Sequence, residues 1–177
     1  NRGVQIEMEQ AATQHLKDIN AYLAPGSKDI DLHGGGFEYD ATVVIPCKNR
    51  VRTIGTAIKS ALSQVVKAPY KFNVIVVDDN SEDGSVDVIK SIVAEGHENL
   101  TYIAQDKTWH AIGGNWNVAL HHEKCGRFAI QLDSDDTYFD ENTVQKFIDA
   151  FVEQNCAMVV GTYQLTDFDG NLIPPGV

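Results

Sequence analysis

Carboxylates gather at two places in the sequence, each directly after a short apolar run. Residues 78–79 follow an apolar run over 72–77, and residues 133–136 follow another over 128–132. In an open parallel sheet, ligands bind just beyond the carboxyl ends of the strands. Carboxylate oxygens placed there suit a hard divalent cation and the polar groups of a ligand. The sequence therefore predicts a site for a cation and a polar ligand rather than a structural cluster.

The second cluster reads Asp133-Ser134-Asp135-Asp136. Two carboxylates two residues apart at the end of a strand can both reach one bound complex of a cation and its ligand. Oxygen ligands of this kind favour Mg²⁺ or Mn²⁺. A solvated turn before the next helix would explain the same residues. A calcium loop of the EF-hand type fits poorly, because the twelfth position counted from Asp133 is Val144 rather than Glu.

The first cluster resembles the start of a calcium loop more closely, through Asp79, Ser81 and Asp83. We reject calcium there, because the twelfth position is Lys90, which supplies no carboxylate, and because a strand precedes the cluster. Asp78 or Asp79 could instead accept a hydrogen bond from a hydroxyl or N–H group of a ligand, as in ribose or base recognition. Capping of the following helix is the alternative.

The turn Pro46 to Arg50 follows the first predicted strand. Its backbone amides, together with Lys48 or Arg50, could meet a phosphate or a base at the start of a helix. The turn lacks the glycines and the Gly-Lys-Ser/Thr ending of a phosphate-binding P-loop. Taken alone, these residues favour a solvated basic turn.

A fourth segment, residues 109–117, lies between the third predicted strand and its helix. Gly113 and its neighbour Gly114 allow the backbone to approach a ligand closely. Asn117 could orient a sugar or a diphosphate. A turn with a buried tryptophan is the alternative interpretation.

Composition narrows the classes of partner. The chain has 177 residues, 43% of them hydrophobic and 22% charged, which suits one folded domain of ordinary size. Its net charge of −11 and its scattered Lys and Arg argue against nucleic acid or an anionic membrane as a partner. No apolar run approaches the roughly 18 residues of a membrane span, and no signal peptide is visible. Three thiols without metal or disulfide spacing indicate a cytoplasmic location; they are Cys47, Cys125 and Cys156.

The periodicity divides the chain into an N-terminal helix with a linker, residues 1–40, and a main domain, residues 41–177. The N-terminal helix is predicted over 6–23. In the main domain we predict strands at 42–45, 72–77, 100–104, 128–132 and 157–163, a possible sixth at 172–173, and helices at 54–62, 86–93, 112–120 and 144–151. This alternation indicates an α/β fold with a mostly parallel, Rossmann-like sheet covered on both faces. The start at Asn indicates a fragment or a processed product. The end in a loop predicts that the native protein continues, so that the fold is C-terminally truncated here.

Taken together, these segments resemble a family 2 glycosyltransferase with the GT-A fold, over residues 41 to about 165. The order and spacing of the matching segments are more specific than any one of them. The matching segments are Val44 to Asn49, Val76 to Ser85, Gly113 to Leu120 and Leu132 to Asp136.

The resemblance implies a role for each matched position. The turn would line the nucleotide-base pocket, the first acidic pair would bind the base, and the glycine segment would lie near the diphosphate or the sugar. The second acidic cluster would be the D-x-D motif of the family, with its last two carboxylates on a divalent metal. The residues implied for the nucleotide-sugar are Pro46, Lys48, Asn49, Arg50, Asp78, Asp79, Gly113, Asn117, Asp133 and Ser134, and those implied for Mg²⁺ or Mn²⁺ are Asp135 and Asp136.

The implied activity is inverting, metal-dependent transfer of a hexose from a UDP- or GDP-sugar to a saccharide or lipid-linked acceptor, as in the synthesis of cell-surface polysaccharides. The full-length protein is then expected to be membrane-associated. Two features depart from the family pattern. Trp116 stands where many relatives carry Arg, and the acidic catalytic base is expected beyond the end of this chain, so no base is assigned here.

Three other classes compete with this interpretation. A phosphorelay receiver domain shares the acidic pair after an apolar strand, but a receiver begins with that strand, and Leu132-Asp133 lacks the apolar-Pro turn usual after a phosphorylated Asp. A nucleotidyltransferase usually has a glycine-rich loop after its first strand, which Cys47-Lys48-Asn49 is not. A non-catalytic module that binds a nucleotide-sugar stays open, because the deciding base is expected outside the chain.

Overall fold

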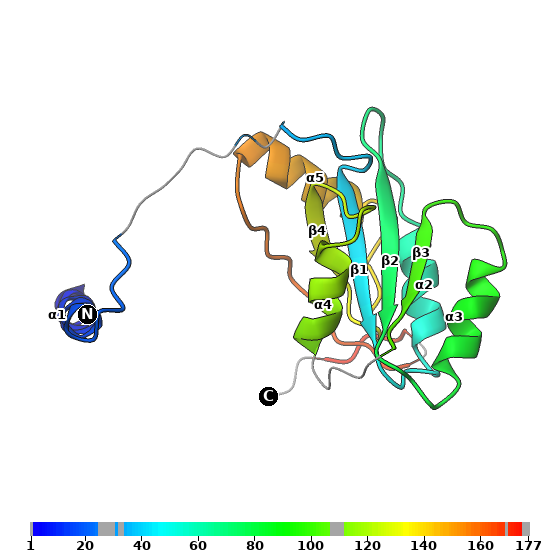
Figure 1. The fold of residues 1–177 in the computed structure, drawn as a ribbon, viewed down its shortest axis with the longest axis horizontal. Coiled ribbons are helices and arrows are strands. Elements are labelled where there is room, and N and C mark those ends of the chain that lie inside the picture. The colour runs from blue at the N-terminus through cyan, green and yellow to red at the C-terminus, as the bar shows by residue number, and fades with distance from the viewer. Residues whose placement is uncertain (1, 25–30, 32–33, 107–111, 169, 175–177) are drawn as a thin grey trace. The chain divides into compact units, whose positions relative to one another are not determined.

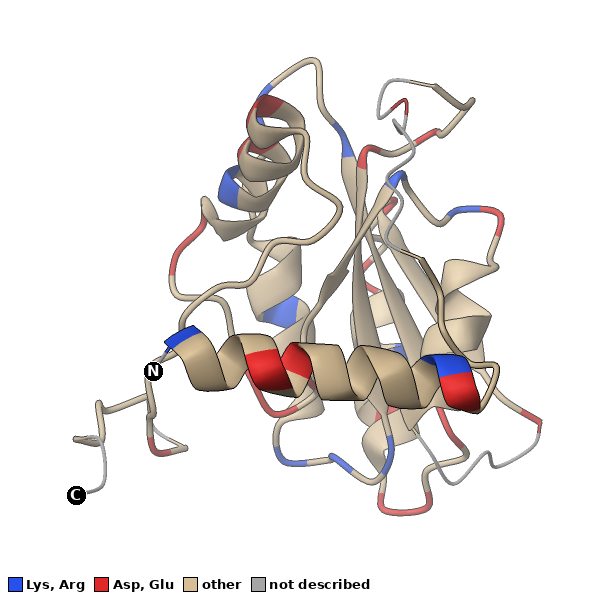
Figure 2. Ribbon diagram, turned by 90° about the vertical axis from the view of Figure 1, so that its left-hand side faces the viewer, with Lys and Arg blue, Asp and Glu red and all other residues tan. Residues whose placement is uncertain are grey.

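The N-terminal part of the chain is one helix. The computed structural model describes residues 2–24, 31, 34–106, 112–168 and 170–174, and its contacts divide the chain into two units, 1–31 and 32–177. Helix α1 spans Arg2–Asp18, carries acidic and basic residues (Figure 2) and has no buried residue. The predicted helix over 6–23 therefore begins and ends earlier. Its end coincides with Asn20, whose φ of 55° is left-handed, a conformation that is common after helices.

The second unit contains a parallel sheet with the strand order β3-β2-β1-β4 (Figure 1). Its strands are β1 (Ala41–Cys47), β2 (Phe72–Asp78), β3 (Leu100–Ala104) and β4 (Phe128–Gln131). All three pairings are parallel, as the sequence predicts. The chain proceeds outward from β1 to β3 and then returns to the other side of β1. This reversal of strand order, between β1 and β4, is where open α/β sheets bind their ligands.

Helices pack on both faces of the sheet. One face carries α2 (Ile54–Leu62), α3 (Ser85–Val93) and α5 (Thr143–Gln154), and the other carries α4 (Ile112–Leu120). Each of these four helices lies within two or three residues of its predicted bounds. Within the part of the chain that the structure describes, no helix has the length and apolar character needed to span a membrane.

The core follows from the two-residue repeat of the central strand. Every residue of β1 is buried, because helices cover both sides of it. Val43 and Ile45 belong to the larger apolar cluster, which also contains Ile58 of α2. Val44 points to the opposite face and belongs to a smaller cluster with Ala119 of α4. The continuous apolar run of β1 thus packs into both apolar clusters, one on each face of the sheet, and this packing fixes the position of the strand.

The fifth predicted strand is wrong. Residues 157–163 form no strand, and Met158, Val160 and Tyr163 are exposed. The predicted sixth strand is reduced to one isolated antiparallel bridge between Thr166 and Leu172. An apolar β-branched run becomes a strand only when a neighbouring strand edge accepts its hydrogen bonds, and no described residue pairs with this run.

Candidate functional site

The loops that follow β1 and β2 are joined at the carboxyl edge of the sheet. The backbone N–H of Asn49 donates to Ser81 Oγ at 2.8 Å, and the N–H of Glu82 donates back to Asn49 Oδ1 at 2.9 Å. Further along, the N–H of Arg50 donates to Ser85 Oγ at 2.7 Å. Asp83 adds a bond by accepting from the N–H of Val51 at 2.9 Å. The predicted turn 46–50 is therefore held against the first acidic cluster.

Two asparagines make this arrangement of loops possible. Asn49 has a φ of 53° and Asn80 a φ of 59°, both in the left-handed region that asparagine tolerates better than most residues. Asp83 also accepts from the N–H of Ser85, the first residue of α3, at 3.0 Å. The residue at the N-cap position is Gly84. Asp83, the residue before it, therefore stabilises the start of α3 without being the N-cap.

The first acidic pair is almost fully buried, and its two members have different partners. Asp79 has a side chain only 3% exposed, and the Lys48 ammonium lies 3.7 Å from its Oδ2 while donating to its backbone carbonyl at 2.6 Å. Asp78 accepts from the N–H of Ser81 through Oδ2 at 3.0 Å. Its other oxygen, Oδ1, has no hydrogen-bond partner within the described part of the chain. Lys48 therefore compensates buried charge, and Asp78 shapes the turn.

The second acidic cluster is crowded and more exposed. The loop is a tight turn in which the N–H of Asp136 donates to the carbonyl of Asp133 at 3.0 Å. Gln131 Nε2 donates to Asp133 Oδ1 at 2.8 Å. Partial loss of water, and after it the negative charges of Asp133 and Asp135, raise the pKa of the Asp136 carboxyl above its usual value. Because these negative charges repel one another, the cluster favours the binding of a cation beside it.

One ion pair connects this cluster to the loop after β1. Arg50 Nε lies 3.5 Å from Asp135 Oδ2, with side chains 47% and 52% exposed. Both acidic clusters therefore contact the same short turn, the first through Lys48 and the second through Arg50. The structure brings these two predicted sets of residues together at the point where the strand order reverses.

A metal held by the protein alone is not supported. Among the described residues, no group of three or more His, Cys, Asp or Glu side chains is placed to hold an ion. The cluster instead fits a cation that takes its remaining ligands from a bound molecule and from water, which is how proteins usually hold Mg²⁺. The like-charge crowding around Asp136 is consistent with such a partial site.

The other predicted residues are placed as follows. Pro46 is not in the turn as predicted, because β1 continues through it to Cys47 and pairs it with Val77. Ser134 is buried. Gly113 and Asn117 lie exposed on α4. The predicted segment 109–117 is described only from residue 112, so Trp109 and His110 lie outside the described residues.

One contact near the site has no signal in the sequence. Gln105, just after β3, donates through Nε2 to Asn115 Oδ1 at 2.6 Å, and its N–H donates to the carbonyl of Asp78 at 3.0 Å. Asn115 is buried on α4. These bonds fix α4 to the end of β2 and so set the position of Asn117 relative to the acidic loops.

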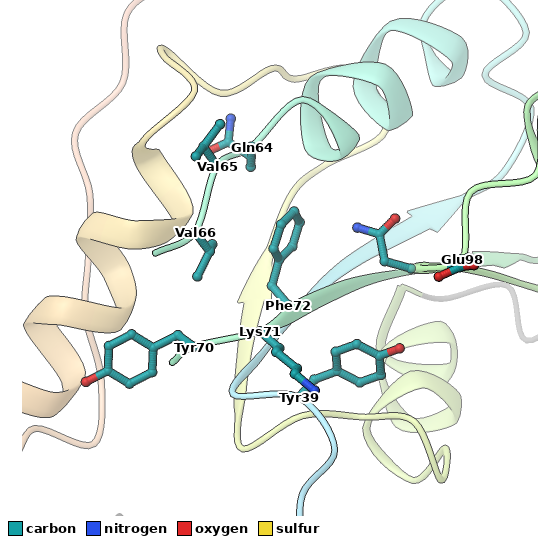
Figure 3. A pocket seen from close by; sticks show the side chains of 9 residues that line it. Tyr39, Gln64, Val65, Val66, Tyr70, Lys71, Phe72 and Glu98 are labelled. Carbon is teal, nitrogen blue, oxygen red and sulfur yellow. The ribbon is translucent and has the colours of Figure 1, made fainter. Parts of the chain in front are cut away.

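A separate pocket of about 480 Å³ opens at the opposite edge of the sheet (Figure 3). Its lining comes from segments that precede β1, β2 and β3 and from Phe72, the first residue of β2, which lies between Val66 and Tyr39. None of the residues predicted for the nucleotide-sugar or the metal lines it. The pocket is therefore distinct from the acidic edge.

The strand order and the acidic loops define the structural class of the protein, which is an α/β protein with its site at the reversal point of a parallel sheet. The family model described as glycosyl transferase family 2 matches residues 42–176, and the chain belongs to this family. The resemblance stated from the motifs is thereby confirmed. The receiver alternative loses its support, because β1 and α2 precede the acidic pair, which ends the second strand.

Similar proteins agree with this assignment. An uncharacterized glycosyltransferase of Haemophilus influenzae is 24% identical over 132 residues, which are 75% of this chain and 50% of that protein. TarS from S. aureus, solved in complex with UDP-GlcNAc, matches with a TM-score of 0.56 and 26% identity over 66% of this chain and 32% of its own. The mannosyltransferase PcManGT of Pyrobaculum calidifontis, solved with GDP-Man and Mn²⁺, matches with a TM-score of 0.55, 19% identity and coverage of 85% and 41%.

These matches confirm the predicted GT-A fold. The chain spans about half of the Haemophilus protein and a smaller share of both structures.

Proposed function

We propose that residues 41–177 form the donor-binding part of a glycosyltransferase that moves a sugar from a UDP- or GDP-sugar to an acceptor hydroxyl with inversion. The observation that carries the proposal is the single turn that contacts both acidic clusters, through Lys48 on Asp79 and Arg50 on Asp135. Membership of the family supports it, as does the UDP-GlcNAc complex of the similar TarS. Saccharide or lipid-linked acceptors and a role in polysaccharide synthesis belong to the same proposal.

Each loop then has a separate task. The turn 46–50 and the buried pair Asp78 and Asp79 would receive the base, since they form a rigid, hydrogen-bonded wall. Asp135 and Asp136 would hold Mg²⁺ or Mn²⁺, which supplies charge compensation for the departing diphosphate. A chain with a net charge of −11 needs this compensation to bind an anionic donor.

Thermal unfolding tests the proposal without knowledge of the acceptor. A ligand that binds only the native state raises the melting temperature by mass action. We expect UDP- or GDP-sugars to raise it more in Mn²⁺ than in EDTA. Asp135→Ala should abolish the difference between Mn²⁺ and EDTA, whereas Glu153→Ala, which removes an exposed carboxylate of α5, should leave it unchanged. A melting temperature that no nucleotide-sugar moves would overturn the proposal.

A further inference from the structure

We propose that Arg50 is a built-in counter-ion, which occupies the Asp135 carboxylate in the free protein and moves to the diphosphate when a divalent cation takes its place. This charge exchange rests on the function proposed above and adds a mechanism by which the binding of the cation and the binding of the nucleotide depend on each other. The guanidinium and the carboxylate come from the loops after β1 and β4, on the two sides of the reversal point, and lie 3.5 Å apart.

The pair is poised to break. Both side chains are about half exposed, and exposed ion pairs contribute little to stability because water and salt screen them. The contact uses Nε of Arg50 at a distance longer than a good hydrogen bond. Little free energy is therefore lost when the guanidinium leaves Asp135.

The backbone of Arg50 is held in place, because its N–H donates to Ser85 Oγ at 2.7 Å. The guanidinium makes two long hydrogen bonds besides the ion pair, from Nη1 to the carbonyls of Lys48 and Asn49 at 3.3 and 3.2 Å, and it releases these bonds when it moves to the diphosphate. The neighbouring cation, Lys48, is occupied by the buried Asp79. Arg50 is thus the member of this turn whose charge can respond to a ligand at the second cluster.

The exchange couples the two ligands. A divalent cation that arrives alone must displace, or lie beside, a positive guanidinium at Asp135, which weakens its binding. A diphosphate that arrives with it offers negative charge and pairs of oxygens that match the planar fork of the arginine guanidinium. The cation and the nucleotide should therefore each strengthen the binding of the other by the same factor.

Two calorimetric titrations of the full chain measure this coupling: one with Mn²⁺ alone, and one with UDP in the presence of Mn²⁺. The decisive variant is Arg50→Gln, and the matched control is Arg52→Gln, whose guanidinium lies over the Phe168 ring at 4.5 Å. We expect Arg50→Gln to bind Mn²⁺ alone several-fold more tightly, and UDP in the presence of Mn²⁺ several-fold more weakly, than the wild type. The Arg52→Gln variant should match the wild type in both titrations.

The outcomes separate this inference from the proposed function. Equal affinity of the wild type and Arg50→Gln for Mn²⁺ alone would overturn the charge exchange, even if UDP binds normally with Mn²⁺. Absence of binding of both UDP and GDP by the wild type in the presence of Mn²⁺ would overturn the proposed function, while the titration with Mn²⁺ alone would still decide whether Arg50 holds Asp135. If Arg50→Gln proves unstable, Arg50→Lys replaces it in the test. This variant keeps the positive charge but lacks the planar fork, so it should bind Mn²⁺ alone as weakly as the wild type and UDP with Mn²⁺ more weakly.

Discussion

Negative charge is crowded into the loop after β4, where three aspartates occur within four residues. The Asp136 carboxyl has lost part of its water and faces the charges of Asp133 and Asp135, and each of these effects raises its pKa by disfavouring the ionised form. In the unfolded chain the same group would ionise near the ordinary aspartate pKa of 3.8. The free protein therefore gains stability when this carboxyl is protonated or removed.

Replacement of Asp136 by Asn should raise the melting temperature at pH 7 in EDTA. The raised pKa means that the native state binds the proton more tightly than the unfolded state does, so the wild type loses stability as the pH rises through the native pKa. The advantage of Asp136→Asn should shrink as the pH falls toward the ordinary aspartate pKa of 3.8. Melting curves from about pH 4 to 8 test this, with Glu153→Gln as the control, and an advantage that is independent of pH would contradict it.

At the scale of single residues, the sequence predicts which side chains lie close together but not which residues they contact. The acidic pairs and the basic turn were identifiable, because strand ends of a parallel sheet meet at one edge. The contact between Lys48 and Asp79, and that between Arg50 and Asp135, come from the two residues that flank Asn49, whose backbone is left-handed. No local pattern announces that conformation, because asparagine occurs in many kinds of turn.

At the scale of elements, the start of β4 depends on a buried hydrogen-bond network. Thr42 Oγ1 accepts from the N–H of Gly126 at 2.6 Å and donates to Asn73 Oδ1 at 2.6 Å, and Asn73 Nδ2 reaches the carbonyl of Lys124 at 2.9 Å. These bonds connect β1 and β2 to the segment that leads into β4. The backbone at Gly126 must therefore pass very close to the end of the linker at Tyr39.

Gly126→Ala should lower the free energy of unfolding by about 1–3 kcal/mol, the usual cost of overpacking. A Cβ at this position would lie 2.8 Å from the carbonyl oxygen of Tyr39 and 3.0 Å from the backbone of Ala41, neither of which is a flexible side chain. Gly36→Ala is the matched control, since nothing lies within 4 Å of its Cβ. Urea denaturation measures both variants, and equal stability of the two would contradict the prediction.

The elements themselves were largely predictable, and the exception has a physical cause. Within the described part of the second unit, four strands follow from short continuous apolar runs, and four helices follow from apolar residues at helical spacing. The run at 157–163 has the same β-branched character, yet it forms no strand. Composition reports the preference of a segment for extended backbone, whereas the presence of a free strand edge depends on the rest of the fold.

At the scale of the whole molecule, the described residues of the N-terminal helix are absent from the two apolar clusters of the sheet unit. None of its residues is buried, and both apolar clusters consist of residues from 41 onward. A chain without residues 1–31 should therefore keep the melting temperature of the sheet unit within about 1–2 °C, because surface changes rarely exceed about 0.5 kcal/mol. Thermal denaturation followed by near-UV circular dichroism tests this, and a large loss would show that α1 stabilises the sheet.

The central position of β1 has a consequence for how the molecule assembles. Its pairing with β2 joins segments close in the chain, whereas its pairing with β4 joins Ala41 to Phe128, which lies much further along the chain. Contacts between such distant segments form slowly, because a long loop must close first. In pulse-labelling hydrogen exchange during refolding, we expect amides of β2 to gain protection before those of β4. The loop after β4, which carries Asp133, Asp135 and Asp136, would then reach its place after the loops that follow β1 and β2.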